Sequence, residues 1–221
     1  MFNSILNVMF SGIVKYVGIV TKSLDGDLEG VIGVSNKDIS RIVEVGGSVA
    51  VNGVCLTVVE KTSEEVYFFA SYETCQKTNI PKLRVGSIVN LELPSTPTTF
   101  LDGHIVLGHI DTMGEVYKIG KLKSSYKLSV SISKEFLKNV VFKGSVAIDG
   151  VSLTVYEIDD SLGIFSVVVI PYTYDNTNLR YLKIGDFVNI EFDIIGKYIE
   201  RFSYFGDKRI TIDKLRDFLG T

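Results

Sequence analysis

The sequence predicts an all-β protein built from two similar six-stranded antiparallel β-barrels in tandem, each with a short helix, followed by a C-terminal helical tail. Three observations lead to this prediction: a long internal repeat, an Asn-Gly or Asp-Gly turn inside each copy, and a change from strand-like to helix-like spacing near residue 194. We expect an N-terminal extension at residues 1–8, barrels at 9–94 and 103–193, a linker at 95–102 and the tail at 194–221.

The repeat is clearest in GSVAVNGVCLTVVE, residues 47–60, which recurs as GSVAIDGVSLTVYE, residues 144–157, with ten identities in fourteen positions. Further matches flank this block at nearly the same spacing, and they pair Gly12 with Gly108, Thr74 with Thr173, Asn79 with Asn178, Asn90 with Asn189 and Glu92 with Glu191. A duplication of this kind predicts two domains of one fold. Between them, PSTPTTF, residues 94–100, has the prolines and hydroxyl residues that are typical of a linker.

Composition excludes several classes of protein. The chain has 221 residues with 23 basic and 26 acidic side chains, and the basic residues are scattered, which argues against nucleic-acid binding. No run approaches the roughly 18 to 20 apolar residues of a membrane span, and the first residues lack the pattern of a secretory signal. The two cysteines form no CxxC pair, so we expect free thiols in a reducing cytoplasm.

Within each half the pattern is mostly that of strands. The repeated block alternates around Asn52-Gly53 in the first copy and Asp149-Gly150 in the second, and both dipeptides favour type I′ hairpin turns because they tolerate positive φ. The runs VYFFA, SIVNLEL, YKLSVSI, IFSVVVI and FVNIEFDI are β-branched and aromatic, as is typical of small barrels.

One short helix is expected in each half. KDISRIVEV follows Ser35 or Asn36 as a cap and stops at Gly46-Gly47, and KEFLKNVV is its copy. The tail places an apolar stripe along a helix, breaks at Gly206-Asp207 and continues as ITIDKLRDFL; the stripe consists of Ile195, Tyr198, Ile199, Phe202 and Phe205. Such a stripe is buried either on the chain's own barrels or between subunits.

Polar side chains follow the hairpin turn in each half. Because residues alternate along a strand, Cys55 and Thr57 face away from the core of the first half, and Ser152 and Thr154 do so in the second. Free cysteines are commonly small buried residues, so Cys55 is either a site thiol or part of a core. The replacement of Cys55 by Ser152 in a retained block suggests two related pockets that do different chemistry.

Both histidines lie in GHIVLGHIDT, residues 103–112. On a continuous strand His104 and His109 project to opposite faces, and no Cys or carboxylate cluster completes a tetrahedral set, so we expect no metal. His109 shares a face with Asp111, which would orient the ring for acid–base work unless this histidine is structural. Cys75 has no charged activator and is interpreted as structural. Motifs of dinucleotide folds, nucleotide hydrolases and α/β-hydrolases are absent from the sequence.

These motifs together closely resemble riboflavin synthase of the α-subunit type, from Met9 to about residue 205. The resemblance is carried by MFSGIV, SVAVNGVCLTV, ETCQKTN, GHIVLGHIDT, SVAIDGVSLTV and IPYTYDNTNL, in that order. It implies a homotrimer of two-barrel subunits held by a C-terminal helix, with each active site between the N-terminal barrel of one subunit and the C-terminal barrel of another. Two molecules of 6,7-dimethyl-8-ribityllumazine would exchange a four-carbon unit without metal or cofactor, giving riboflavin and 5-amino-6-ribitylaminouracil. Whether lumazine synthase is a physical partner stays open.

The resemblance also implies two substrate pockets. The first would consist of a leading segment, the strand after the hairpin turn, and a strand ending at Glu73 and Thr74: Gly12, Ile13, Val14, Cys55, Leu56, Thr57, Phe69, Ala70, Ser71, Tyr72, Glu73 and Thr74. The second would repeat this arrangement with a strand ending Ile170, Pro171 and Thr173: Gly108, His109, Ile110, Lys143, Ser152, Leu153, Thr154, Val168, Val169, Ile170, Pro171, Tyr172 and Thr173.

The implied catalytic residues are Ser48, Cys55, His109, Asp149, Ser152 and Asp193. A base near His109 and Ser48 would remove a proton from the 7-methyl group of one lumazine, and Cys55 or a water that it orients would assist addition at the other. Asp149 is either a turn residue or a proton carrier. The rival functions are a lumazine or flavin carrier of the same fold without turnover, and a generic barrel-type binding module. Eight residues precede the usual Met-Phe start, so Met9 is an alternative initiator.

Overall fold

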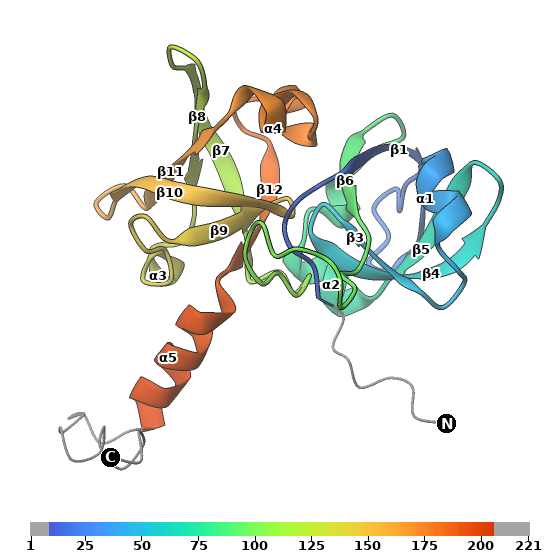
Figure 1. Cartoon of the computed structure of the whole chain (residues 1–221), viewed down its shortest axis with the longest axis horizontal. Coiled ribbons are helices and arrows are strands. Elements are labelled where there is room, and N and C mark those ends of the chain that lie inside the picture. Colours follow the sequence, from blue (N-terminus) through green and yellow to red (C-terminus); the bar gives the residue numbers. More distant parts are fainter. Residues whose placement is uncertain (1–8, 206–221) are drawn as a thin grey trace.

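Two closed antiparallel barrels lie side by side in the computed structural model, which describes residues 9–205 (Figure 1). The first barrel has the circular strand order β1-β2-β5-β4-β3-β6. Its strands are β1 (Tyr16–Lys22), β2 (Gly30–Ser35), β3 (Ser48–Val51), β4 (Val54–Lys61), β5 (Glu65–Ala70) and β6 (Ile88–Glu92). Barrel closure leaves no strand edge unpaired, and the apolar residues inside form a separate core.

The second barrel repeats the first in the same circular order, β7-β8-β11-β10-β9-β12. Its strands are β7 (Thr112–Lys121), β8 (Tyr126–Ser131), β9 (Ser145–Ile148), β10 (Val151–Asp159), β11 (Ile164–Val169) and β12 (Phe187–Phe192). It encloses its own core. The expected fold of two tandem six-stranded barrels is therefore confirmed.

Both predicted hairpin turns are present. Asn52 and Gly53 have φ values of 46° and 76°, and Asp149 and Gly150 have 45° and 79°. Positive φ at both turn residues is the property of type I′ turns that made the dipeptides informative.

Each half holds two short helices and a 3-10 turn, where the sequence predicted one helix. In the first half these are α1 (Lys37–Ile42), α2 (Tyr72–Lys77) and η1 (Ile80–Lys82); in the second they are α3 (Lys134–Leu137), α4 (Pro171–Asp175) and η2 (Asn178–Tyr181). Asn36 caps α1, which ends well before Gly46. The prediction of strands running to Glu73 and to Thr173 was wrong. β5 stops at Ala70 because the Ser71 hydroxyl caps α2, and Pro171 lacks the N–H that a continued β11 ladder would need.

Residues 103–111 are also not the continuous strand that was expected. Phe10 and Val106 form an isolated bridge with N–H···O distances of 2.7 and 3.1 Å, and β7 begins only at Thr112. This segment is therefore held by contacts outside the barrel strands, such as the bridge to Phe10. The prediction that His104 and His109 project to opposite faces of one strand does not apply to it.

The tail begins as predicted with a helix, α5 (Ile194–Phe205), which projects away from the second barrel (Figure 1). Its apolar side chains Ile195, Tyr198, Ile199 and Phe202 are exposed in the single chain. The described part of the barrels does not bury these four side chains, so the first of the two expected alternatives is not observed for them. The second amphipathic piece, residues 210–219, and the extension at residues 1–8 lie outside the described residues.

Buried asparagines join the two barrels about a pseudo-twofold axis. The side-chain oxygen of Asn90 in β6 accepts a hydrogen bond from the main-chain nitrogen of Asn178 in the other half, at 2.7 Å. The side-chain oxygen of Asn189 in β12 accepts one from the main-chain nitrogen of Asn79, also at 2.7 Å. Because each barrel supplies an acceptor and a donor, neither barrel satisfies these buried groups alone.

The hairpin tips meet at this axis. The amide groups of the same two strand asparagines donate to the main-chain oxygens of Asp149 and Asn52, both at 2.9 Å. A Cβ atom on Gly53 would lie 2.6 Å from the nitrogen of Gly150, so the contact requires glycine. The turn residues therefore also fix how the barrels are joined.

Asp149 is the acidic member of this network and is 1% exposed. Its carboxyl accepts hydrogen bonds from the Asn189 main chain at 2.8 Å and from the side chains of Asn79 and Asn178 at 3.1 and 2.7 Å. Burial nevertheless raises its pKa to about 7, because desolvation outweighs these hydrogen bonds. Asn52 occupies the pseudo-symmetric position with a neutral amide.

We predict that Asp149 makes the stability of the protein depend on pH. Its folded pKa of about 7 lies above the usual 3.8, so its contribution is full below pH 3.8 and is lost as the pH rises through about 7. Relative to Asp149→Asn, the wild-type free energy of unfolding should fall by up to about 1.4 kcal/mol per pH unit over this range. Urea titrations at several pH values measure this difference.

The matched variant is Asn52→Asp, which places a second acid at the pseudo-symmetric position and should steepen the fall. Parallel pH profiles for wild type and Asp149→Asn would contradict the assignment.

Candidate functional site

The segment that leads into each barrel lies against the other barrel. The Cys55 nitrogen of β4 donates to the Gly108 oxygen at 3.0 Å, and the Ser152 nitrogen of β10 donates to the Gly12 oxygen at 2.8 Å. Val14 packs against the core of the second barrel, and Ile110 packs against the core of the first. The two halves thus exchange their leading segments.

This exchange corrects the predicted grouping of the pockets. The predicted first pocket combines Gly12, Ile13 and Val14 with the Cys55 strand, and the predicted second pocket combines Gly108, His109 and Ile110 with the Ser152 strand. The repeat shows which segments are equivalent, but it carries no information on which barrel each segment contacts. The first-barrel site therefore consists of the Cys55 strand with residues 108–110, and the second-barrel site of the Ser152 strand with residues 12–14.

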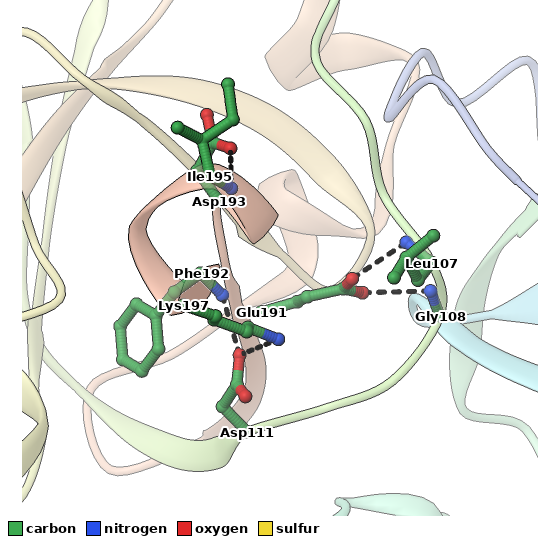
Figure 2. A network of polar contacts seen from close by, with 8 residues as sticks. All are labelled: Leu107, Gly108, Asp111, Glu191, Phe192, Asp193, Ile195 and Lys197. Atoms are coloured by element: carbon green, nitrogen blue, oxygen red, sulfur yellow. Dashed lines mark hydrogen bonds and ion pairs between the residues drawn. The ribbon is translucent and has the colours of Figure 1, made fainter. Parts of the chain in front are cut away.

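Two buried glutamates hold the exchanged segments. Glu191 at the end of β12 accepts hydrogen bonds from the main-chain nitrogens of Leu107 and Gly108 at 2.7 and 2.9 Å (Figure 2). Glu92 at the end of β6 accepts from the main chain of Ser11 and Gly12 at 2.8 and 3.2 Å, and from the Ser11 hydroxyl at 2.8 Å. Burial raises the pKa of both carboxyls, that of Glu191 to about 7.

The first-barrel site brings together Ser48, Cys55 and the segment that carries His109. Burial raises the pKa of the Cys55 thiol, the negative charge of Glu191 raises it further, and a hydrogen bond with Ser48 opposes them. The group is therefore a neutral thiol near neutral pH. A neutral thiol is a weak donor and a poor nucleophile, so it suits orientation of a water or a ring better than covalent attack.

The outer face of β4 and β5 extends this site. Thr57 is paired with Phe69 across the two strands, and both side chains are exposed. Ser71, Tyr72, Glu73 and Thr74 follow in the first turn of α2. The corresponding region of the second barrel consists of Thr154, Val168, Ile170, Pro171, Tyr172 and Thr173, at the start of α4. The remaining predicted contacts, Leu56, Ala70, Leu153 and Val169, have buried side chains, so only their main chains can meet a ligand.

The second-barrel site contains a buried histidine that the prediction did not place there. The His104 ring nitrogen Nδ1 lies 2.7 Å from the Ser152 hydroxyl, and the ring is 7% exposed. Burial lowers the pKa of His104, while the nearby charge of Asp193 opposes that shift. His104 is thus neutral near neutral pH and is able to accept a proton. Its Nε2 atom is buried without a hydrogen-bond partner among the described residues.

The other histidine is arranged differently from the expectation. His109 is exposed beside Gly108, and Asp111 does not orient it. Asp111 instead accepts a hydrogen bond from the Phe192 nitrogen at 2.9 Å and pairs with Lys197 of α5 at 2.7 Å (Figure 2). The shared face predicted for His109 and Asp111 depended on a continuous strand, which this segment does not form.

Two further predicted residues lie at the margins of the sites. Asp149 belongs to the network between the barrels, and none of its hydrogen bonds reaches Cys55 or Ser152; the geometry gives it the turn role. It lines a cleft of about 590 Å³ between the barrels, together with Asn52, Asn79 and Asn178.

Lys143 is exposed, with its ammonium 5.3 Å from the centre of the Phe142 ring. Cys75 is buried in α2, as its structural interpretation requires.

Among residues 9–205, no group of three or more His, Cys, Asp or Glu side chains is arranged to hold a metal ion. In the same part of the chain, no helix is both long and apolar enough to cross a membrane.

Comparison with known proteins identifies the family. The model of the lumazine binding domain matches twice, at residues 11–94 and 107–193. Riboflavin synthase of Actinobacillus pleuropneumoniae is 39% identical over 88% of this chain and 89% of its own length. The chain belongs to the riboflavin synthase family. The riboflavin synthase of Schizosaccharomyces pombe is 34% identical over 87% of this chain and 93% of its own, and that of Bacillus subtilis is 33% identical over 88% and 89%.

Solved structures agree with this membership. LumP complexed with riboflavin matches this chain with a TM-score of 0.76 at 32% identity. The match covers 83% of this chain and 98% of the LumP chain. LumP complexed with 6,7-dimethyl-8-(1′-D-ribityl) lumazine has a TM-score of 0.74 at 31% identity with the same coverage. The resemblance stated from the sequence motifs is confirmed, and so is its implication of a transferase in the riboflavin synthase family.

Sequence reasoning missed three residues that organise the sites: His104, Glu92 and Glu191. The glutamates were visible as a matched pair in the repeat, each near the end of a strand that is apolar except for one asparagine. A charged residue retained in both copies at such a place signals a buried partner. His104 lay in the recognised motif, but only a metal role was tested for it.

We predict that alanine at Gly108 or Gly12 disrupts the exchanged contacts. At Gly108 a Cβ atom would lie 2.5 Å from the Cβ of Cys55, and at Gly12 it would lie 2.6 Å from the Cβ of Ser152. Gly46 also has positive φ but has nothing within 4 Å, so Gly46→Ala measures the backbone strain alone. Overpacking should make Gly108→Ala and Gly12→Ala less stable than Gly46→Ala by about 1 to 3 kcal/mol in urea unfolding. Equal losses in all three variants would show that the close contacts are not present in solution.

Proposed function

We propose that this chain is a riboflavin synthase that catalyses the dismutation of 6,7-dimethyl-8-ribityllumazine. Two molecules exchange a four-carbon unit to give riboflavin and 5-amino-6-ribitylaminouracil, which is the last step of riboflavin biosynthesis. The two products together contain the atoms of the two substrates, so the reaction consumes no oxidant or reductant. The substrate is chosen on the basis of the family and of the neighbour named as a lumazine complex.

The observation that carries the proposal is the pair of related but unequal sites. Both are built from a strand after a type I′ turn and a segment exchanged from the other half, so both can bind the same molecule. Yet one offers a thiol beside Ser48, and the other offers Ser152 bonded to His104. The same ring system would thus be bound twice and treated differently.

The second-barrel site suits removal of a proton from the acidic 7-methyl group. His104 is neutral and buried, and its Nδ1 lies 2.7 Å from the hydroxyl of the less buried Ser152, so a proton can pass to the imidazole through the hydroxyl. Asp193 carries a charge that stabilises the imidazolium so formed. The proton is returned to the amine nitrogen of the departing pyrimidine, which balances the step.

The first-barrel site suits activation of the second ring. Its neutral Cys55 thiol and the Ser48 hydroxyl can orient a water for addition to that ring, and exposed His109 stands on the neighbouring segment. Main-chain groups of residues 108–110 and the Thr57 hydroxyl can meet the polar edge of a pyrimidinedione. This division of roles keeps Ser48, Cys55, Ser152, His109 and Asp193 in the reaction and adds His104.

Assembly would bring the two kinds of site together. The exposed apolar face of α5 needs a partner, and we assign other copies of this chain to it, as a homotrimer. Holding two rings in register can contribute roughly 7 to 11 kcal/mol to lowering the barrier of a bimolecular reaction. A cytoplasmic location accords with the free thiols Cys55 and Cys75. Association with lumazine synthase stays an expectation that co-sedimentation of the two proteins tests.

A lumazine or flavin carrier without turnover is the second candidate. It is favoured by three structural neighbours, which are LumP complexes with 6,7-dimethyl-8-(1′-D-ribityl) lumazine, riboflavin and flavin mononucleotide. The catalytic side chains in both barrels of this chain favour the enzyme.

Incubation of the purified protein with 6,7-dimethyl-8-ribityllumazine separates these functions. The enzyme should form one riboflavin for every two lumazines consumed, measured by absorbance and chromatography. Tight binding with no riboflavin formed would identify the carrier, and neither binding nor turnover would leave the generic binding module.

The two histidines provide a matched pair of variants. His104→Ala should lower kcat about 100-fold or more, because the proton acceptor beside Ser152 is lost. His109→Ala tests the imidazole on the exchanged segment, and a wild-type rate would remove that group from the mechanism. Full turnover by His104→Ala would refute the role of the His104–Ser152 pair, and full turnover by Cys55→Ser would do the same for the thiol.

A further inference from the structure

Two ion pairs attach α5 to the second barrel, and they differ in surroundings. Lys197 of α5 pairs with Asp111 at 2.7 Å, and the two side chains are only 26% and 23% exposed. Glu200 of α5 pairs with Lys138, where the side chains are 45% and 64% exposed. A better shielded pair is less screened by solvent, so the Lys197 contact constrains the helix more strongly.

Asp111 is fixed on the barrel as well as on the helix. Its main-chain nitrogen donates to the Ile190 oxygen at 3.0 Å, and its carboxylate accepts from the Phe192 nitrogen at 2.9 Å. Figure 2 shows this carboxylate between the end of β12 and the Lys197 ammonium. The start of α5, the end of β12 and residue 111 therefore form one connected unit.

The segment that ends at Asp111 is the one that covers Cys55. Its Leu107 and Gly108 nitrogens donate to Glu191, and its Gly108 oxygen accepts from the Cys55 nitrogen. Lys197 acts at both ends of this segment, because its charge also lowers the pKa of Glu191 against the effects of burial and of Asp111. The charged and titratable groups that face Glu191 are thus Lys197, Asp111 and Cys55.

We propose that Lys197 is a positioning residue, which holds residues 107–111 against Cys55 through Asp111 and Glu191 and so couples the placement of α5 to the first-barrel site. The inference rests on the proposed function only in taking that site as a lumazine site. The coupling of α5 to residues 107–111 and Cys55 does not depend on which ligand the site binds.

Loss of the ammonium would leave two carboxylates without their cation. Glu191 would then take up a proton more readily, and a protonated carboxyl accepts less well from the two nitrogens that it holds in place. The segment would loosen where it meets Cys55. In this way a change on the helix reaches the site without any contact between Lys197 and a ligand.

The equivalent segment of the other half has no acid at the position of Asp111. Lys15 stands where the repeat places the counterpart of Asp111, and Glu92 is held by the Ser11 hydroxyl in addition to two main-chain nitrogens. The leading causes of the pKa shift of Glu92 are burial, which raises the pKa, and hydrogen bonds from residues 11–13, which lower it. The coupling is therefore specific to the Cys55 site, which matches the asymmetry between the two sites.

The test is the alkylation rate of Cys55 by iodoacetamide in the full-length protein, followed by peptide mass spectrometry at constant pH. Lys197→Met should increase the rate about fivefold, the effect of losing a partly buried ion pair. Lys197→Arg should restore the wild-type rate. Cys75 in the same molecules is the internal control and should not change.

Lys138→Met is the matched control, because it removes the ion pair with Glu200 of α5 without touching residues 107–111. Sedimentation of each variant accompanies the alkylation. An unchanged Cys55 rate in Lys197→Met, an equal rise in Lys138→Met, or a rise seen only in dissociated protein would each overturn the proposal. Failure of lumazine turnover in the wild type would refute the proposed function and leave this alkylation result intact.

Discussion

Each barrel of this chain depends on the other for the segment that borders the strand after its type I′ turn. Glu92 and Glu191 anchor the leading segments on their own barrels, and the main-chain oxygens of Gly12 and Gly108 then reach Ser152 and Cys55 on the opposite ones. The exchange explains why glycine is required at both crossing points, where a side chain would collide with the facing strand. It also means that neither site exists within an isolated half, although each half has its own core.

The asparagine network is a second feature through which the two barrels depend on each other. Hairpin turns that appear local in sequence place Asn52 and Asp149 at the axis between the barrels, where strand asparagines of the partner barrel bind their main chains. Small differences between the halves then act on an otherwise symmetric frame. At the axis, the first half has the amide Asn52 where the second has the acid Asp149. In the sites, the first half has a thiol where the second has a serine. Lys197 of α5 lowers the pKa of Glu191, the anchoring glutamate of the second half. Duplication supplies the frame, and these few polar replacements distinguish the two halves.

Much of the fold follows from the sequence alone. The repeat predicted two equivalent barrels, Asn52-Gly53 and Asp149-Gly150 predicted their turns, and strand alternation placed Cys55 and Ser152 outside the two barrel cores, although Cys55 packs against a third buried cluster that contains Phe10 and Val106. The exchanged segments could not be predicted, because a repeat defines equivalence and gives no information on which copy contacts which. α2 was missed because a single capping serine ends β5, a weaker signal than the β-branched run before it. Asp111 was assigned to His109 from strand periodicity, which tertiary contacts with Phe192 and Lys197 override.

The proposed function requires that one chain carry two related sites for the same heterocycle, each completed by a segment from the opposite half. A crystal structure with an unreactive lumazine analogue bound is the decisive measurement. We expect two bound rings per chain, one bordered by Cys55 and residues 108–110, the other by Ser152 and residues 12–14. A single ring, or rings bordered by a barrel and its own leading segment, would contradict it.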